Sequence, residues 1–123
     1  MSVGECQTAD WFKIGQQDGN AGQADIIGKR VDSCREQKVD IALNSVGAYR
    51  SGYVQGVRNY CQPNRILDEG LAGRDRVDIC PLETQYGLRP FAQAGMRVYS
   101  ANQSIDRIHS EQSRLGSELQ NKN

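Results

Sequence analysis

Apolar residues recur at steps of three and four along most of the chain, and no stretch shows the sustained alternation of a half-buried strand. Stripes of this kind run through residues 8–20, 24–37 and 40–61. A shorter helix is expected at 65–72, and the charged stretch 74–78 that follows is expected to form an exposed loop. The pattern predicts an all-α protein.

The first three stripes differ in what they place on the inner face. In residues 8–20 the stripe begins with Trp11 and continues into glycines around Asp18, so a bulky side chain is followed by a groove. In residues 24–37 it ends at Cys34, which should point inward. The third helix should begin after an N-cap at Asp40 and stop at Pro63.

The strongest periodic signal lies in the C-terminal part of the chain. Its stripe consists of Phe91, Ala94, Val98, Ala101, Ile105, Ile108, Gln112, Leu115 and Leu119. Pro90 suits the first position of a helix, which predicts one long helix over residues 90–120, roughly 45 Å in length. A helix of that length should project from a small domain or find a partner.

Two interpretations of this helix remain open. Its first half should pack within the chain. The second half, through Ile105, Ile108, Gln112, Leu115 and Leu119, could form a parallel or antiparallel homodimer seam, with Gln112 helping to set the register.

Composition argues against binding to nucleic acid or anionic lipid and predicts a small core. The 123 residues contain 15 lysines and arginines against 15 acids, so no net charge favours nucleic acid or anionic lipid. Only 37% of the residues are hydrophobic and 13 are glycine, which predicts a thin core in a single domain over 1–123. We expect a helical core at 6–80, followed by the long helix at 90–120.

Because the core is thin, the cysteines are expected to add stability to the fold. Cys6, Cys34, Cys61 and Cys80 form an even set without the spacing of a zinc site, which favours two disulfides and an extracytoplasmic location. The alternative is four free thiols in a cytosolic protein. The chain opens without an apolar segment, so we expect that a leader has been replaced by Met1.

Two glycine pairs indicate a close helix crossing. Gly15 with Gly19, and Gly52 with Gly56, each place small residues one turn apart on different helices. A tight crossing beside Trp11 would offset the helix stability that glycine costs. The alternative is a ligand pressed against bare backbone.

These residues together resemble a family. The set is Cys6-x4-Trp11-x3-Gly15-x2-Asp18-Gly19-x2-Gly22, Cys34, Tyr49-x2-Gly52-x3-Gly56-x3-Tyr60-Cys61, Gly70-x2-Gly73 and Cys80. It is similar to a family of small bacterial lipoproteins, the domain of unknown function numbered twenty-seven ninety-nine. The resemblance implies an envelope lipoprotein, outer-membrane anchored, whose body folds in the periplasm, and it implies no activity. The chain departs from the family at Gln16, where an aromatic residue is common, and at Arg30 and Val31, where a histidine is common.

A lipid on Cys6 is not expected, because Glu5 precedes it where a lipoprotein processing site has a small residue. Four cysteines allow three pairings. We favour Cys6 with Cys34 and Cys61 with Cys80, because each pair joins neighbouring elements.

A catalytic site is not expected, and neither is a cofactor or a metal. His109 is the only histidine and lies beside the seam. Among the carboxylates, Asp10 is typical of a helix N-terminus, while Asp68 and Glu69 indicate a solvated helix face. Asp18 lies on the glycine face, where burial would require a partner such as Arg50 or Arg58. The residues considered for binding are Asp18, Arg50, Tyr53, Asp68 and Glu69.

The leading hypothesis is a non-enzymatic envelope module that binds a protein partner, for example an immunity protein that blocks a toxin. A second hypothesis is a small cell-wall glycan hydrolase that uses Asp18 with Glu69 or Asp68, two carboxylates that would share a cleft. A third is a structural lipoprotein that self-associates through its C-terminal helix.

Overall fold

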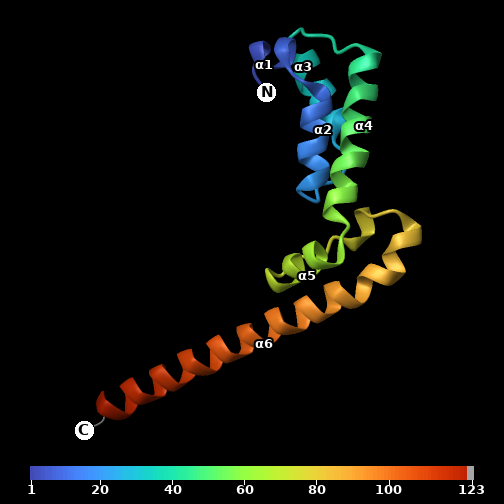
Figure 1. The fold of residues 1–123 in the computed structure, drawn as a ribbon. Coiled ribbons are helices and arrows are strands. Elements are labelled where there is room, and N and C mark those ends of the chain that lie inside the picture. Colours follow the sequence, from blue (N-terminus) through green and yellow to red (C-terminus); the bar gives the residue numbers. More distant parts are fainter. Residues whose placement is uncertain (122–123) are drawn as a thin grey trace.

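The computed structural model describes residues 1–121, and within them it is entirely helical apart from turns and loops (Figure 1). The helices are α1 (Val3–Thr8), α2 (Trp11–Asn20), α3 (Ile27–Glu36), α4 (Leu43–Tyr60), α5 (Pro63–Leu71), a 3₁₀ turn η1 (Val77–Ile79) and α6 (Leu82–Asn121). The all-α prediction is confirmed, together with the long C-terminal helix and both disulfides.

Three helix boundaries differ from the sequence prediction. The N-cap of α4 is Ala42, so the assignment of this role to Asp40 is wrong. Pro63 does not merely end α4; it also opens α5 at a position where the missing N–H costs nothing. The stretch 74–78, expected to be an exposed loop, contains the first two residues of η1, and Val77 within it is buried.

Helix α6 begins at Leu82, eight residues before Pro90, so the prediction that Pro90 starts the helix is wrong. Proline is tolerated in this interior position because a helix can bend where the backbone hydrogen bond is lost. Figure 1 shows α6 bending in its gold, N-terminal part.

Helices α2 and α4 cross at backbone contact. A Cβ atom built on Gly15 would lie 1.9 Å from the carbonyl oxygen of Tyr49, and one on Gly52 would lie 1.9 Å from that of Phe12. Gly19 and Gly56 face backbone atoms of the opposite helix in the same way. The two glycine pairs therefore mark the axis along which these helices meet.

Helices α5 and α6 repeat this arrangement. A Cβ on Gly70 would come within 2.8 Å of the Ala92 carbonyl oxygen, and one on Gly95 within 2.6 Å of the Leu67 carbonyl oxygen. The molecule thus contains two glycine-mediated helix crossings.

Each crossing has its own hydrophobic cluster and its own disulfide. The first cluster is built from buried residues Cys6, Trp11, Ile27, Cys34 and Tyr49. The second is built from Tyr60, Ile66, Val77, Cys80, Leu88 and Ala92. The disulfides join Cys6 to Cys34 and Cys61 to Cys80, as predicted.

The two halves share a sequence motif that ends their first helices. Asp18-Gly19-Asn20-Ala21-Gly22 corresponds to Glu69-Gly70-Leu71-Ala72-Gly73. Gly22 and Gly73 have positive φ, 74° and 85°, and donate to the carbonyls of Gly19 and Gly70. The following residue donates to Asp18 in one half and to Glu69 in the other, which completes the same Schellman cap.

The correspondence continues beyond the cap. Arg30-Val31-Asp32-Ser33-Cys34 matches Arg76-Val77-Asp78-Ile79-Cys80, and each segment ends in the second cysteine of a disulfide. Gly56-x3-Tyr60 matches Gly95-x3-Tyr99, and the two tyrosine rings lie over Gly22 and Gly73. The chain is therefore an internal duplication of one disulfide-closed helical unit.

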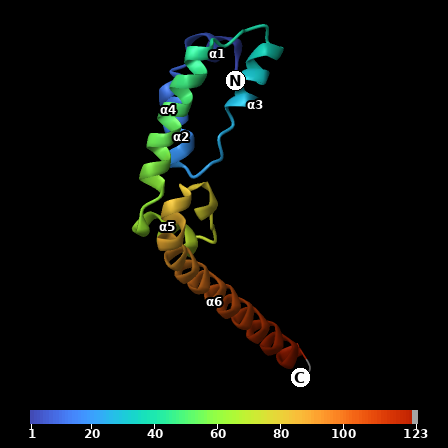
Figure 2. The ribbon, with the colours of Figure 1, turned by 90° about the vertical axis from the view of Figure 1, so that its right-hand side faces the viewer.

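Beyond its contact with α5, α6 continues alone. Figures 1 and 2, at right angles to each other, both show it leading away from the other helices. Residues 101–121 are all exposed. The α5 contact uses Leu88, Ala92 and Gly95, all buried, whereas Phe91 and Val98 are exposed. The first half of α6 therefore packs within the chain, as expected, but α5 covers a face beside the apolar stripe, so Phe91 and Val98 stay exposed.

Candidate functional site

Asp18 is buried, with 7% of its surface exposed, and three donors surround its carboxylate. Arg30 donates from Nη2 to Oδ1 at 2.9 Å and from Nε to Oδ2 at 3.1 Å. The Tyr49 hydroxyl donates to Oδ2 at 2.6 Å. The partner is therefore Arg30 on α3, and the expectation of Arg50 or Arg58 is wrong.

The Tyr49 side chain ties this ion pair to a third element. Its hydroxyl accepts a hydrogen bond of 3.4 Å from the backbone N–H of Ile26. Burial, together with the hydrogen bond to Asp18, raises the pKa of Tyr49 well above its usual value, so the phenol stays neutral and remains a donor. The network clamps α2, α3 and α4 together, which is a structural role.

Glu69 is the second buried carboxylate, 6% exposed, at the place in the second unit that Asp18 takes in the first. Arg74 pairs with it directly, and Arg65 Nη2 lies 3.6 Å from its Oε1. The hydrogen bond that Arg74 donates to the Glu69 carboxylate raises the pKa of Arg74. Asp68 is exposed as expected, but the prediction of a solvated face is wrong for Glu69, which is buried beside Arg74 and Arg65.

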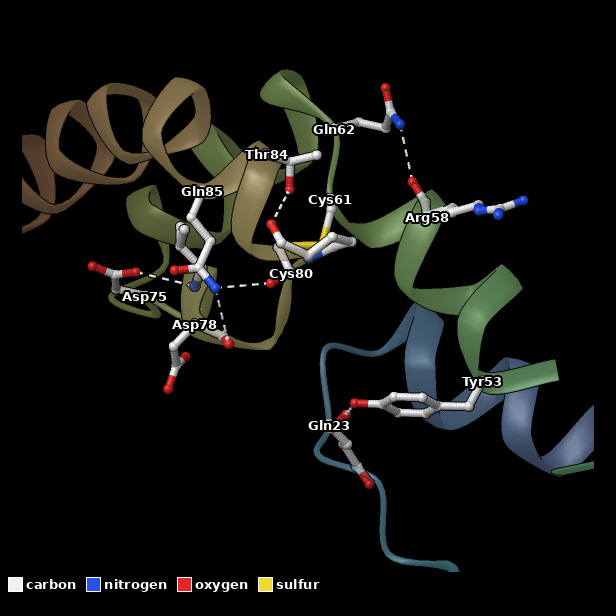
Figure 3. The surroundings of a disulfide bond; sticks show 12 residues. Gln23, Tyr53, Arg58, Cys61, Gln62, Asp75, Asp78, Cys80, Thr84 and Gln85 are labelled. Atoms are coloured by element: carbon white, nitrogen blue, oxygen red, sulfur yellow. Dashed lines mark hydrogen bonds between the residues drawn. A yellow bond between two sulfur atoms is a disulfide. The ribbon is translucent and has the colours of Figure 1, made fainter. Parts of the chain in front are cut away.

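The remaining residues considered for binding are more exposed. Arg50 lies 3.7 Å from Asp25 in an open ion pair. The Tyr53 hydroxyl donates to the Gln23 carbonyl at 2.8 Å (Figure 3). The Tyr53 ring stacks on the Tyr49 ring, with their centroids 6.2 Å apart. Tyr53 therefore braces the loop after α2.

Tyr60 and two arginines join the two units. Arg65 and Arg76 donate to the carbonyl oxygens of Asn20 and Ala21 at the end of α2, at 2.9 and 3.1 Å. The Arg65 guanidinium also lies 5.2 Å from the centre of the Tyr60 ring. These contacts cap the C-terminus of α2 with positive charge, which the helix dipole favours.

A shallow groove of about 310 Å³ lies beside the second disulfide, between α4 and the start of α6. Its walls include Val54, Val57 and Arg58 of α4, with Ile79 and Pro81 opposite. Figure 3 shows Arg58 near the Cys61 to Cys80 bridge. Neither Asp18 nor Glu69 lines this groove, so it brings no pair of buried carboxylates together.

The apolar seam of α6, meaning the nine-residue stripe from Phe91 to Leu119 described above, is an exposed feature of the part of the chain that the structure describes. Its large side chains are substantially exposed: Val98 47%, Ile105 48%, Ile108 56%, Leu115 49% and Leu119 68%. His109 lies on the same exposed helix. The seam is a surface suited to binding.

Over residues 1–121, no three His, Cys, Asp or Glu side chains gather in a way that could hold a metal ion. No helix in that range combines the length and apolar character needed to cross a membrane.

Comparison with known proteins yields one match. A family described as "Protein of unknown function (DUF2799)" matches residues 10–97. No curated protein and no solved structure matches the chain. The matched region contains both glycine crossings and ends two residues before Tyr99, whereas most of the apolar seam lies beyond it.

Proposed function

The chain belongs to this family of unknown function, and we propose that it is a non-enzymatic interaction module of the cell envelope that binds a protein partner through the apolar seam of α6. Support comes from a single observation. Five large apolar side chains, from Val98 to Leu119, line one face of α6, and every residue of 101–121 is exposed.

Physical chemistry explains why such a face needs a partner. Burying a side chain such as Ile or Leu contributes about 1.5–3 kcal/mol relative to leaving it in water. Contiguous apolar surface on an otherwise polar protein typically marks an interaction site. The polar remainder of α6 keeps the free helix soluble, so the seam stays available for binding.

The two disulfides support an address outside the cytosol, because such bonds persist in oxidising compartments. We propose that the protein resides in the periplasm as an outer-membrane lipoprotein; the disulfides support only the oxidising compartment, and the lipid anchor is part of the proposal. Fractionation of cells, with labelling of the native gene product by a radioactive fatty acid, tests this location. Recovery in the cytosol without label would contradict it.

The burial of Asp18 and Glu69 counts against the glycan hydrolase hypothesis. It required two free carboxylates in one cleft, but Asp18 and Glu69 are each buried in an ion pair. Inhibition of a toxin would be one form of protein binding, and it stays a prediction.

Affinity capture from envelope extract tests the proposed function. The wild-type protein should retain a partner that the double variant Ile105→Ser/Ile108→Ser loses, because the substitutions remove the centre of the seam. The matched control is Gln103→Ser/Arg107→Ser on the opposite face of the same turns, which should bind like wild type. Equal recovery by wild type and the seam variant would contradict the proposal.

A further inference from the structure

We propose that the partner is a second copy of the chain, paired antiparallel along α6 with Ile105 facing Ile108 of the second copy. This inference rests on the proposed function, because it uses the same seam. It names the partner and fixes the direction and register of the two helices.

The seam itself is self-complementary in this register. Its positions alternate between the two inward-facing sites of a heptad, and in an antiparallel pair one type faces the other. Around the central isoleucines, Ala101 faces Gln112 of the second copy, and Val98 faces Leu115 of the second copy. The large polar side chain of Gln112 thus meets one of the two alanines of the seam. Two-fold symmetry repeats every contact.

Charge supports the antiparallel direction. One edge of the seam carries Arg97, Ser104, Glu111 and Glu118. The proposed register brings Arg97 opposite Glu118 of the second copy, twice by symmetry. In a parallel pair these two residues would lie 21 positions apart, roughly 31 Å along the axis. Only the antiparallel arrangement pairs opposite charges.

A glycine at the edge of the seam also fits the proposed register. A Cβ on Gly116 would have nothing within 4 Å, although glycine in a helix interior weakens a helix relative to alanine. In the proposed register Gly116 faces Gly95 of the second copy. Within its own chain Gly95 packs against the α5 backbone at Leu67 and Leu71, so a side chain at position 116 would approach α5 of that copy.

The fold leaves room for this pairing. Helix α5 covers Leu88, Ala92 and Gly95, which lie on a face beside the seam. The facing positions run over residues 94–119, roughly 38 Å of helix, and lie mostly on the projecting part of α6. The second copy can therefore dock without displacing α5.

Sedimentation equilibrium of the oxidised full chain measures the association. We expect a dimer for wild type, and a dissociation constant raised about tenfold for Arg97→Glu, since two attractive contacts become repulsive. The double variant Arg97→Glu/Glu118→Arg should return toward the wild-type value. Arg107→Glu, on the opposite face, is the matched control and should leave the dissociation constant unchanged. Failure of the double variant to recover would overturn the register.

Cross-linking tests the direction separately. Copies carrying Val98→Cys and copies carrying Leu115→Cys, tagged to differ in mass, are mixed and mildly oxidised. The antiparallel dimer should give mixed disulfides between the two species. Preferential cross-linking of Val98→Cys to itself would indicate a parallel pair and overturn the proposal.

The outcome also separates this inference from the proposed function. A strict monomer at high concentration that still binds another protein through the seam overturns the second-copy inference alone. A strict monomer whose seam variant binds the same partners as wild type overturns both.

Discussion

At the residue scale, burial determines how much an ion pair contributes to the stability of the fold. Asp18 and Asp25 both lie beside an arginine, but the Asp18 side chain is 8% exposed and that of Asp25 is 36% exposed. Removing one partner of a buried pair leaves an uncompensated charge in a poor solvent. An exposed pair is screened by water and contributes little.

We predict that Asp18→Asn lowers the free energy of unfolding by about 3 kcal/mol, because the charge of Arg30 loses its counterion while the shape is kept. Asp25→Asn is the control and should change stability by less than about 0.5 kcal/mol. Urea denaturation followed by circular dichroism measures both variants. Equal midpoints for the two would refute a special role of the buried network.

At the element scale, glycines on one helix have different meanings. Gly47 and Gly52 both lie in α4, yet a Cβ on Gly47 would meet nothing within 4 Å, while one on Gly52 would collide with the α2 backbone. The helix propensity of the residue is the same at both sites. The neighbouring helix decides whether a methyl group is tolerated.

Gly47→Ala is therefore expected to stabilise the protein by up to about 1 kcal/mol, through helix propensity alone. Gly52→Ala should cost about 3 kcal/mol, because α2 and α4 must move apart to admit the methyl group. Thermal unfolding of both variants gives the comparison. A stabilising effect of Gly52→Ala would show that the crossing is looser than the structure indicates.

The disulfides also act at the element scale, because each one closes one of the two repeated units. They span 28 and 19 residues, for which chain entropy predicts about 3 kcal/mol of stability each. Cys61→Ala/Cys80→Ala and Cys6→Ala/Cys34→Ala should both lower the denaturation midpoint by a comparable amount. A loss confined to one pair would mean that the two units do not depend equally on their bridges.

At the scale of the whole molecule, the repeat explains the shape. Two copies of one glycine-crossed, disulfide-closed unit follow each other, and the last helix of the second copy extends beyond its crossing. The first copy has no such extension, because α4 ends at Tyr60 and the chain turns directly into Cys61 and α5. The extension is thus an addition to the repeat and carries the unpartnered surface.

Truncation after Ala101 tests whether the repeat alone supports folding while the extension of α6 supports association. The two hydrophobic clusters contain no residue beyond that point, so unfolding of the truncated monomer should match that of the dissociated full chain. Association through α6 should be lost. A large drop in monomer stability would show that the projecting helix also supports the body.

Several features could be predicted from the sequence because they depend on local spacing. Periodicity at three and four residues identified α2 to α6, though not the short α1, and it also identified the glycine pairs and the apolar seam. Closeness along the chain identified the disulfide pairing. The duplication was also present in the sequence, as Asp18-Gly19-x-Ala21-Gly22 and Glu69-Gly70-x-Ala72-Gly73, but only alignment of the chain with itself would have found it.

What the sequence by itself determined, then, is the helical class, the faces rich in glycine and the covalent bridges. Only the tertiary structure decided that Arg30 pairs with Asp18, that Glu69 is buried and that α5 covers Leu88 and Ala92 rather than the seam. The physical reason is that periodicity defines the faces of a helix, whereas the element that covers each face depends on the geometry of loops and crossings elsewhere in the chain.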